Sequence, residues 1–461
     1  MVKNKYLYIT LLSVLGFHQE AIAQIVAATP KLVVNITIDQ LRSDFMESYV
    51  PLYSNDGFKR LLLQGRIYPH ASYHFSPVDR ASAVATLSTG TSPYYHGITG
   101  VEWFDRQSLK TVRCISADNN GYSPMHLLTS TIGDEMRMTS NGVALVYAIA
   151  PTADVAILSA GHAANGVMWV NQNRWNNATF YGPVPQWQTD YTRTYAVEPD
   201  VNKSITDLAV SCLEKSTIGI DDTPDYLSVT YQQQGASPRE SYINIDQQLS
   251  RLITRIEGRV GSGKVLFVLT GTGYAIEPEE EGNEEKYHIP TGKFNIQRTA
   301  NLLNMYLGAI YGPAKYVETC YKNQLYLNRQ LIERQNISQS ELLNRAQDFL
   351  LQVEGVRNVY TSTQLLTSES ERLEKIRNAY CIDKCGDLLI DVAPGWKLIN
   401  EETQQTTTQR TNFVSFPIIF YGANVTRERV LTSVTVDRIA PTIAKAIRIR
   451  APNGCASEPL F

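Results

Sequence analysis

The chain is poor in histidine, in net charge and in long apolar runs. The low net charge and the lack of long apolar runs each exclude a class of protein. Only 7 of its 461 residues are histidine, and after His162 the only one is His288. The formal net charge of −3 provides no basic field for nucleic acid and no polybasic patch for anionic lipid. Beyond the N-terminus, no stretch reaches the roughly 18 uninterrupted apolar residues of a membrane-spanning helix. We therefore expect neither a nucleic-acid-binding protein nor an integral membrane protein.

The N-terminus has the pattern of a cleaved secretory signal. Lys3 and Lys5 precede an apolar run that ends at Phe17, and the small-x-small sequence Ala21-Ile22-Ala23 follows it. The run is too short to span a membrane, and no cysteine follows the small residues as a lipid-anchored form would require. We expect residues 1–23 to be removed and the mature protein to be periplasmic, extracellular or associated with the cell surface.

Six cysteines in an exported chain are able to form disulfides, although the sequence leaves their pairing open. Cys381 and Cys385 are close enough in the sequence to close a small loop. The full set is Cys114, Cys212, Cys320, Cys381, Cys385 and Cys455.

Buried strands alternate with amphipathic helices along most of the chain. Residues 31–38 form a continuous apolar, β-branched run that ends at Asp39, which is typical of a strand buried on both faces of a parallel sheet. Further strands are expected at 143–150, 226–231, 265–270, 356–361, 388–392 and 416–421, and helices at 125–138, 241–257, 296–311, 338–353 and 436–447. This alternation predicts an α/β fold with a doubly wound, mostly parallel sheet and helices on both faces.

Two stretches interrupt the alternation and are expected to form cap insertions in one domain covering residues 24–461. One, near 169–222, is rich in aromatic and polar residues. The other, near 275–295, contains the acidic run 277–285, which we interpret as a solvated loop because its carboxylates are consecutive rather than alternating as calcium ligands are.

A series of short motifs gives the chain a family resemblance. From Asp39 onward it resembles the alkaline phosphatase superfamily, in its nucleotide pyrophosphatase and type I phosphodiesterase branch, and the exported bacterial phosphatases above all. The motifs occur in family order and are ITIDQLRSDF (36–45), GFKRLLLQGRIYPHASY (57–73), STGTSPYYHGITGVEWF (88–104), AILSAGHAANGVMW (156–169), YLNRQLIE (326–333), GVRNVYT (355–361) and FPIIFYGANV (416–425).

The resemblance implies a reaction in which a Thr or Ser at a helix N-terminus attacks phosphorus with the help of two zinc ions. Asp39 matches the first metal-binding aspartate. The nucleophile position is occupied by Arg80, next to Asp79, and arginine cannot deprotonate to attack phosphorus. With no other ligand retained, we expect Asp39 to cap the following helix or to accept backbone N–H groups, and Arg80 to form ion pairs with Asp79 and Asp39.

The other positions that the resemblance implies have also changed. At the positions where the resemblance implies phosphate binding, this chain has neutral or acidic residues. At the positions where it implies metal ligands, the chain has residues that do not bind zinc. The loop 232–241 also lacks the Asp-x-x-x-His pair that the resemblance implies. The replaced positions are Val101, Thr152 and Asp154 for phosphate, and Thr272, Gly273 and Ser415 for metal.

No other residue supplies an obvious substitute. Ser82 lies two helical positions from Arg80, about 200° around the helix axis, so it should point away from the site. His70 and His74 are spaced by four in an extended segment, about 13 Å apart. His96 and His162 belong to retained motifs and are expected to make buried hydrogen bonds, and His288 to lie in a loop.

Three functions remain open. The first is a catalytically degenerate phosphatase-like protein that needs no cofactor and acts by binding another exported or envelope protein. The second is a hydrolase of phosphate or related esters with altered, metal-poor chemistry. The third is a glycan binder that uses the aromatic stretch from Trp169 to Tyr191, which includes Trp175 and Trp187, although such residues usually just pack an insertion, which is the interpretation we favour.

Overall fold

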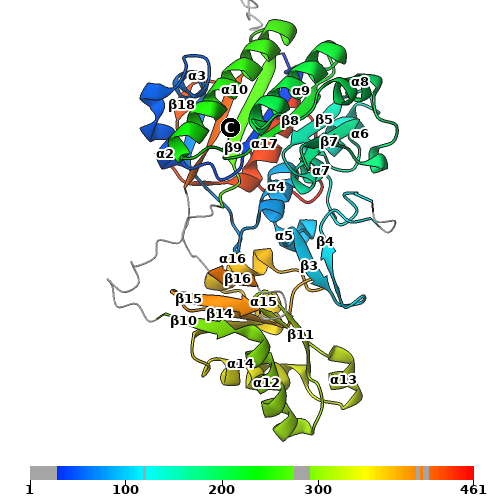
Figure 1. Cartoon of the computed structure of the whole chain (residues 1–461), viewed down its shortest axis with the longest axis vertical. Helices are drawn as coiled ribbons and strands as arrows, with labels where there is room; N and C mark the ends of the chain where they lie inside the picture. Colours follow the sequence, from blue (N-terminus) through cyan, green and yellow to red (C-terminus); the bar gives the residue numbers. More distant parts are fainter. Residues whose placement is uncertain (1–27, 118–120, 275–290, 401–404, 409–414) are drawn as a thin grey trace, which may run out of the picture.

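The central strands of the main sheet are parallel and completely buried. The computed structural model describes residues 28–117, 121–274, 291–400, 405–408 and 415–461. β1 (Leu32–Ile38) pairs in parallel with β8 (Asp225–Tyr231) on one side and with β9 (Val265–Gly271) on the other. Every residue of these three strands is buried, because helices cover both faces of the sheet (Figure 1). β5 (Val146–Ala150) and β6 (Gly166–Asn171) extend the parallel part.

Antiparallel strands complete the two edges of this sheet. β17 (Phe416–Gly422) is antiparallel to β9 and to β2 (Arg66–Ser72), and β7 (Arg174–Asn176) is antiparallel to β6. β18 (Glu428–Arg429) and β19 (Val434–Thr435) pair with β2. The strand order is β18-β2-β17-β9-β1-β8-β5-β6-β7. The predicted α/β fold with a mostly parallel sheet is therefore confirmed.

Successive side chains of β1 point to opposite faces and enter two separate cores. Leu32, Val34 and Ile36 belong to one core, beneath α9 (Val201–Lys215) and α10 (Pro238–Val260). Val33 belongs to the other, beneath the helices α4 (Arg80–Thr89), α6 (Ile132–Thr139), α7 (Ala153–Ala160) and α17 (Ile439–Ile447). Smaller helices complete this lobe: α2 (Ser43–Ser48), η1 (Val50–Leu52), α3 (Phe58–Gln64), α5 (Pro93–His96), η2 (Thr179–Tyr181), α8 (Gln186–Thr194) and η3 (Val436–Arg438).

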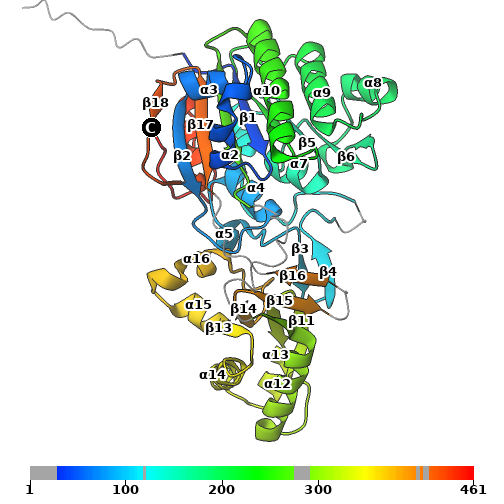
Figure 2. The same cartoon turned by 60° about the vertical axis from the view of Figure 1, so that its left-hand side comes forward.

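A second lobe has its own sheet and its own core (Figures 1 and 2). Its four strands run in the order β11 (Val317–Tyr321), β12 (Gln324–Leu327), β14 (Leu388–Val392) and β13 (Val356–Thr361), and all are antiparallel. Residues of α12 (Ile296–Tyr311) and α14 (Gln339–Leu350) share its core. The lobe also contains α13 (Arg329–Arg334), α15 (Ser362–Thr367), α16 (Glu371–Ala379) and a sheet of β10 (Gly292–Asn295), β15 (Trp396–Asn400) and β16 (Gln405–Thr408).

This second sheet corrects one expectation from the sequence. The strands at 356–361 and 388–392 exist, but they lie in the second lobe rather than in the main sheet. A short apolar run predicts a strand without specifying its partner, because the pairing depends on contacts far apart in the sequence. The expected insertion near 275–295 falls mostly outside the described residues, and the described chain resumes just before β10.

A hairpin from the main lobe is bonded to the second lobe. It consists of β3 (Glu102–Asp105) and β4 (Lys110–Arg113). Arg106, in its turn, forms an ion pair with the fully buried Asp387 at 3.0 Å and donates to the carbonyl of Cys385 at 2.8 Å. Tyr321 of β11 donates to Glu102 at 2.8 Å. These contacts fix the position of the hairpin against the second lobe.

Local capping decides where several helices begin. The predicted helix at 125–138 starts only at Ile132, because the side chains of Thr131 and Asp134 each accept a backbone N–H from the other residue and form a capping box. The helix expected at 241–257 extends from Pro238 to Val260. In the described part of the chain, no helix is both long enough and apolar enough to cross a membrane.

The sequence left the pairing of the cysteines open, and in the structure they are unpaired. All six lie in the described part of the chain, and no disulfide joins any of them. Cys381 and Cys385 are neighbours in a turn, where the backbone N–H of Cys381 lies 3.4 Å from the sulfur of Cys385. Burial raises the pKa of the Cys385 thiol to about 12, which keeps it protonated.

Candidate functional site

Four side chains from separate elements meet where the central strands end. Asp39 follows β1 and Thr272 follows β9, so the parallel strands deliver both residues to the same edge of the sheet. Arg80 is the first residue of α4, and Asp154 lies in the first turn of α7. We call these four residues the Asp39 cluster.

Asp39 accepts a hydrogen bond from a side chain rather than capping a helix. It is almost completely buried, and its Oδ1 accepts the hydroxyl of Thr272 at 2.8 Å. Burial raises the pKa of Asp39, against the opposing effects of the Thr272 hydrogen bond and the positive charge of Arg80. The next helix, α2, has Arg42 at its N-cap and no side-chain cap. The expectation that Asp39 caps this helix is therefore wrong, whereas its alternative, that Asp39 accepts backbone N–H groups, agrees with the backbone hydrogen bond from Gln40 that helps to lower the Asp39 pKa.

Arg80 forms an ion pair with Asp154 and not with the two acids expected, Asp79 and Asp39. Its Nε and Nη2 donate to the two carboxylate oxygens of Asp154 at 2.9 and 3.3 Å. Asp154 is nearly buried, with 8% of its side chain exposed, against 27% for Arg80. The charge of Asp39 also acts on Arg80 and helps to raise its pKa. The predicted ion pair with Asp79 is not among the contacts of the described residues.

Asp79 is instead the N-cap of α4. Its Oδ1 accepts the backbone N–H of Ala81 at 2.9 Å, and its own N–H donates to Ser82 at 3.0 Å. This capping box satisfies N–H groups that a helix start leaves without partners. Ser82 is fully buried, and its hydroxyl also donates to the carbonyl of Asp79 at 2.9 Å. It is therefore held as a structural group and not presented as a nucleophile.

Gly273, at an expected ligand position, lies in a place that aromatic rings have filled. Its φ is +67°, and a Cβ atom there would lie 2.5 Å from the ring of Phe416 and 2.6 Å from the ring of Tyr73. Tyr73 is buried next to Asp39, whose charge adds to burial in raising the Tyr73 pKa. Neither ring was expected at the site from the sequence, although the alternating aromatic residues around the end of β2 were a signal for Tyr73.

The other replaced positions also have structural surroundings. Val101 packs against the core of the main lobe. Thr152 is the N-cap residue of α7, and its buried hydroxyl makes no hydrogen bond within the described part of the chain. Ser415 accepts the backbone N–H of Ser43 through its carbonyl and donates from its hydroxyl to Pro69 at 3.2 Å.

The histidines considered from the sequence are held apart from one another. His70 contacts Ser415 at 3.2 Å, whereas His74 pairs with Asp437 at 3.2 Å, so they do not share a site. His96 is fully buried, and burial lowers its pKa to about 3. Its Nδ1 accepts the N–H of Ile98, so the neutral ring donates to Thr86 through Nε2 at 3.1 Å.

His162 makes the opposite kind of contact. Its Nδ1 lies 2.9 Å from Asp134, and its Nε2 lies 3.0 Å from the carbonyl of Leu127. Both partners accept hydrogen bonds, and the hydrogen bond to Asp134 raises the pKa of His162, which favours the doubly protonated ring. The buried hydrogen bonds predicted for His96 are confirmed; His162 makes its hydrogen bonds with 36% of its side chain exposed, and His288 lies outside the described residues.

The side chains of the Asp39 cluster do not fit a pair of zinc ions. Zinc sites in proteins need several nitrogen, oxygen or sulfur donors around one ion. In the described part of the chain, no group of three or more His, Cys, Asp or Glu residues could hold a metal ion. Asp154 is committed to Arg80 and Asp39 accepts from Thr272, while Thr272 and Gly273 stand where the resemblance implies ligands.

The aromatic stretch considered as a glycan surface packs against the main core instead. Trp175, Trp187 and Tyr191 are partly buried against the core beneath α9 and α10. The ring of Trp187 lies 5.6 Å from that of Tyr147. The indole N–H groups of Trp175 and Trp187 are both buried. The packing interpretation of these residues is therefore the one that the structure favours.

The fold and the position of the cluster define an alkaline phosphatase-like α/β protein, and comparison with known proteins agrees. The model of the type I phosphodiesterase / nucleotide pyrophosphatase family matches residues 33–414. The chain therefore belongs to this family.

Individual relatives match almost the whole chain at low identity. A protein named calcium-transporting ATPase from Myroides odoratus is 23% identical over 94% of each chain, and alkaline phosphatase PafA from Elizabethkingia meningoseptica is 21% identical, also over 94% of each. The crystal structure of wild-type PafA superposes with a TM-score of 0.81 at 20% identity, covering 94% of this chain and 98% of that one. At this identity, the structural match establishes the fold.

Proposed function

We propose that this chain is an alkaline phosphatase-like protein that has lost metal-dependent ester hydrolysis and acts by binding. The observation that carries the proposal is the ion pair between Arg80 and Asp154 at the head of α4. Arg80 stands where the resemblance places the nucleophile, and a guanidinium remains protonated at every physiological pH. It supplies no lone pair to attack phosphorus, and its charge opposes a cation at the same place.

The rest of the Asp39 cluster supports the same proposal. Rebuilding a metal site requires Asp39 to exchange the Thr272 hydrogen bond for a metal, and Asp154 to leave Arg80. A histidine at position 273 would also have to displace the rings of Phe416 and Tyr73. The changes are therefore linked by packing, and reversing one of them leaves the others in place.

The proposal is tested by zinc content and turnover. We expect the purified protein, dialysed against Zn²⁺, to contain much less than one zinc per chain, and to release no product from p-nitrophenyl phosphate, bis(p-nitrophenyl) phosphate or p-nitrophenyl sulfate at micromolar enzyme. Arg80→Thr, which restores a hydroxyl, should remain inactive because the ligand positions stay unfilled. Stoichiometric zinc together with zinc-dependent turnover by the unaltered chain would overturn the proposal.

A second candidate is a hydrolase of phosphate or related esters with altered, metal-poor chemistry. Family membership and the names of the relatives favour this candidate, since several are alkaline phosphatases. One contact also favours it, because the Thr272 hydroxyl lies 2.8 Å from the Asp39 carboxylate, as a nucleophile lies beside a general base.

Two features of Thr272 weigh against that use. Its side chain is fully buried, and its hydroxyl already accepts the N–H of Gln40 at 3.0 Å. Turnover by the unaltered protein that is lost in both Thr272→Val and Asp39→Asn, at unchanged stability, would establish the second candidate. Turnover that survives in both variants would indicate a contaminating phosphatase.

Export and an exported or envelope partner belong to the same proposal. Support for export comes from the N-terminal sequence pattern alone, since residues 1–27 lie outside the described residues. Mass spectrometry of the protein from its native host should find Gln24 as the first residue. Affinity purification with reversible cross-linking should recover an envelope protein, and recovery of cytoplasmic proteins alone would contradict this part of the proposal.

A further inference from the structure

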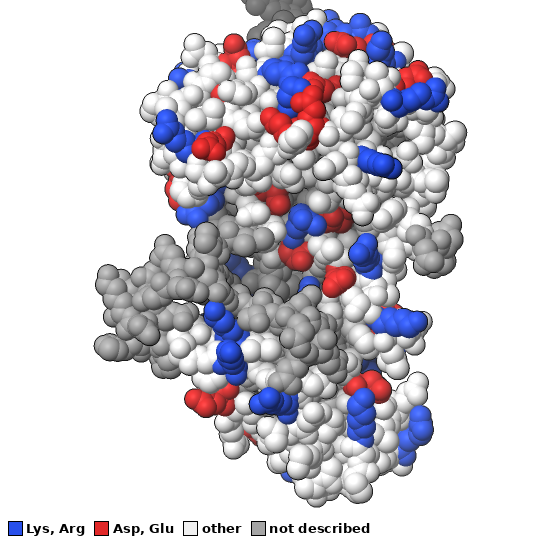
Figure 3. Space-filling view, viewed as in Figure 1, with Lys and Arg blue, Asp and Glu red and all other residues white. Residues whose placement is uncertain are grey.

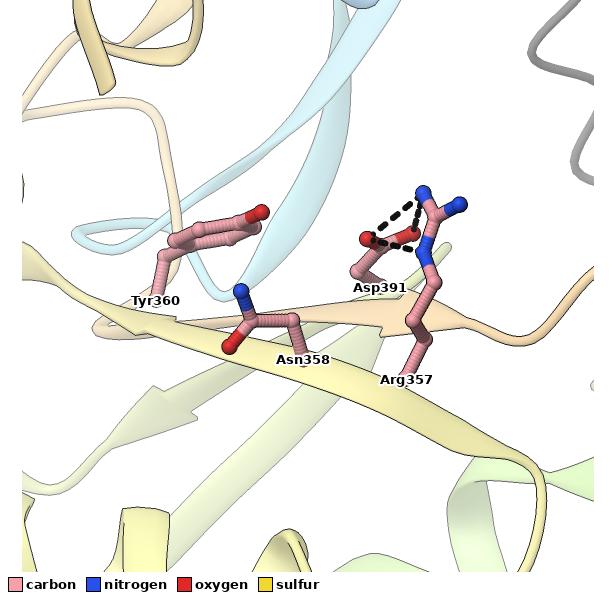
Figure 4. Close-up of a pocket in the computed structure, with 4 residues that line it drawn as sticks. All are labelled: Arg357, Asn358, Tyr360 and Asp391. Atoms are coloured by element: carbon pink, nitrogen blue, oxygen red, sulfur yellow. Dashed lines mark hydrogen bonds and ion pairs between the residues drawn. The ribbon is translucent and has the colours of Figure 1, made fainter. Parts of the chain in front are cut away.

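The second lobe carries a polar cavity on one face of its sheet. The cavity has a volume of about 320 Å³ and is lined by Arg357, Asn358 and Tyr360 of β13 and by Asp391 of β14. All four side chains rise from the same side of the two strands (Figure 4). The opposite side of β13 and β14 contributes Val359 and Ile390 to the core of the lobe.

A β-bulge explains why Arg357 reaches this face. Val356 pairs with Val392, but the next pair is Asn358 with Asp391, so the register shifts between them. In a regular strand Arg357 would point away from Asn358, whereas a bulge redirects the extra residue. The guanidinium then meets Asp391 side on, with Nε 2.8 Å from Oδ2 and Nη2 2.9 Å from Oδ1.

The ion pair is fixed, and the rest of the lining offers hydrogen-bonding groups. Asp391 is nearly buried, whereas 45% of the side chain of Arg357 is exposed. The amide oxygen of Asn358 accepts the N–H of Val359 at 2.9 Å, which directs its NH₂ group away from the backbone. Tyr360, which also lines the cavity, is partly buried against the small core of Leu365, Tyr380, Cys385 and Leu389. For Nη1 of Arg357, the NH₂ of Asn358 and the hydroxyl of Tyr360, no hydrogen bond is recorded within the described part of the chain.

The charges in the cavity select against an anionic ligand. The positive charge of Arg357 is neutralised by Asp391, so a phosphate or carboxylate would find no net positive charge. The cavity still offers N–H donors from Arg357 and Asn358, the carboxylate lone pairs of Asp391 and the aromatic ring of Tyr360. This is the combination that a neutral, hydroxyl-rich ring requires, since its C–H face packs on an aromatic ring while its hydroxyls both donate and accept.

We propose that this cavity binds a neutral saccharide. Tyr360 provides the surface for one sugar ring, and Asn358 with the Arg357–Asp391 pair binds its adjacent hydroxyl groups. The volume lies at the small end of the range for ligand sites, about 300–1,000 Å³, which suits one or two sugar rings at the end of a glycan. No residue of the Asp39 cluster lines the cavity, so the proposal is independent of whether that cluster hydrolyses esters.

The experiment uses the full mature chain on an array of neutral oligosaccharides of hexoses and N-acetylhexosamines, followed by calorimetry with the best of them. We expect weak, saturable binding that falls at least about tenfold in Tyr360→Ala, the size expected for loss of one aromatic contact. Asn358→Ala should weaken it similarly. Tyr95→Ala, which removes an exposed tyrosine of α5 in the main lobe, is the matched control and should bind as the unaltered protein does.

Three results would overturn the proposal. They are no binding to any neutral oligosaccharide on the array, equal binding by Tyr360→Ala and the unaltered chain, and binding of adenosine 5′-monophosphate or inorganic phosphate in preference to every neutral sugar. Circular dichroism and unfolding midpoints of each variant show whether the lobe is intact. Should Tyr360→Ala unfold, Tyr360→Leu, which retains apolar packing, takes its place with the same expected loss.

Discussion

Removing the charge of Arg80 tests whether its ion pair holds the Asp39 cluster together. The conservative change is Arg80→Met, which keeps a long unbranched side chain and removes every donor. It leaves Asp154 without its counter-ion, although only 8% of that side chain is exposed. The position at the start of α4 is otherwise unchanged, because Asp79 caps the helix through backbone contacts.

The size of the effect follows from burial. Breaking a fully buried ion pair by removing one partner costs about 3–5 kcal/mol, whereas exposed pairs contribute about 0–1 kcal/mol. With 27% of Arg80 exposed, the pair lies between these limits, and we expect Arg80→Met to lower the free energy of unfolding by about 2 kcal/mol. Asp154→Asn should lower the free energy of unfolding by about 1 kcal/mol, because the guanidinium of Arg80, left without its carboxylate, is still hydrated.

The assay is a double-mutant cycle in urea, followed by tryptophan fluorescence. Arg80→Met/Asp154→Asn should cost about 2 kcal/mol rather than the sum of the single changes, a coupling of about 1 kcal/mol. Arg345→Met, which breaks the exposed pair with Glu341 on α14, is the control and should leave the unfolding midpoint unchanged.

A coupling of zero would refute the reasoning. It would mean that Arg80 and Asp154 act independently and that the geometry of the pair contributes nothing to the stability of the cluster. A stabilised Arg80→Met would refute it as well, because the guanidinium would then destabilise the fold rather than hold the Asp39 cluster together.

Four further predictions concern other parts of the chain. Gly273→Ala should lower the free energy of unfolding by about 2–4 kcal/mol through overpacking and positive φ, whereas Gly263→Ala, also at positive φ but with open space around it, should cost about 1 kcal/mol in the same urea titration. The raised pKa of His162 means that its stabilisation is present below pH 6.5 and lost as pH rises through the folded value, so His162→Gln should flatten the pH dependence of the melting temperature above pH 6.5. Asp387→Asn should cost about 2–4 kcal/mol and expose the 102–113 hairpin to limited proteolysis, because two arginines lose a buried carboxylate. Trp187→Ala should lower stability by about 2 kcal/mol and leave sugar binding on the array unchanged.

Much of the architecture was predictable because it depends on local pattern. The run of apolar, β-branched residues at 31–38 predicted a strand buried on both faces, and β1 lies at the centre of a parallel sheet. Helices such as α12 were predicted from their 3.6-residue periodicity. The sequence also predicts, from a count along a motif, that Arg80 stands at the nucleophile position of the family, and this stays a prediction.

Contacts between distant residues were not predictable in the same way. Asp79, one residue from Arg80, was expected to be its partner, yet Asp154, which is 74 positions away, forms the ion pair. Asp79 is the N-cap of α4, and its carboxylate accepts a backbone N–H of the helix. It is therefore not directed to the guanidinium of Arg80. The strands at 356–361 and 388–392 were assigned to the wrong sheet for a related reason, since apolar pattern contains no information on pairing.

Residue identity alone determined which chemical groups the chain possesses: an arginine at position 80, few histidines, and an acid at the end of the first strand. The tertiary structure alone decided what those groups do. In the fold, Arg80 pairs with Asp154, and Asp39 accepts a hydrogen bond from Thr272. Two aromatic rings occupy the space beside Gly273, and a β-bulge directs Arg357 toward Asp391. The physical reason is that charge and hydrogen-bonding capacity belong to a side chain, whereas its partner is set by which backbone segments pack together.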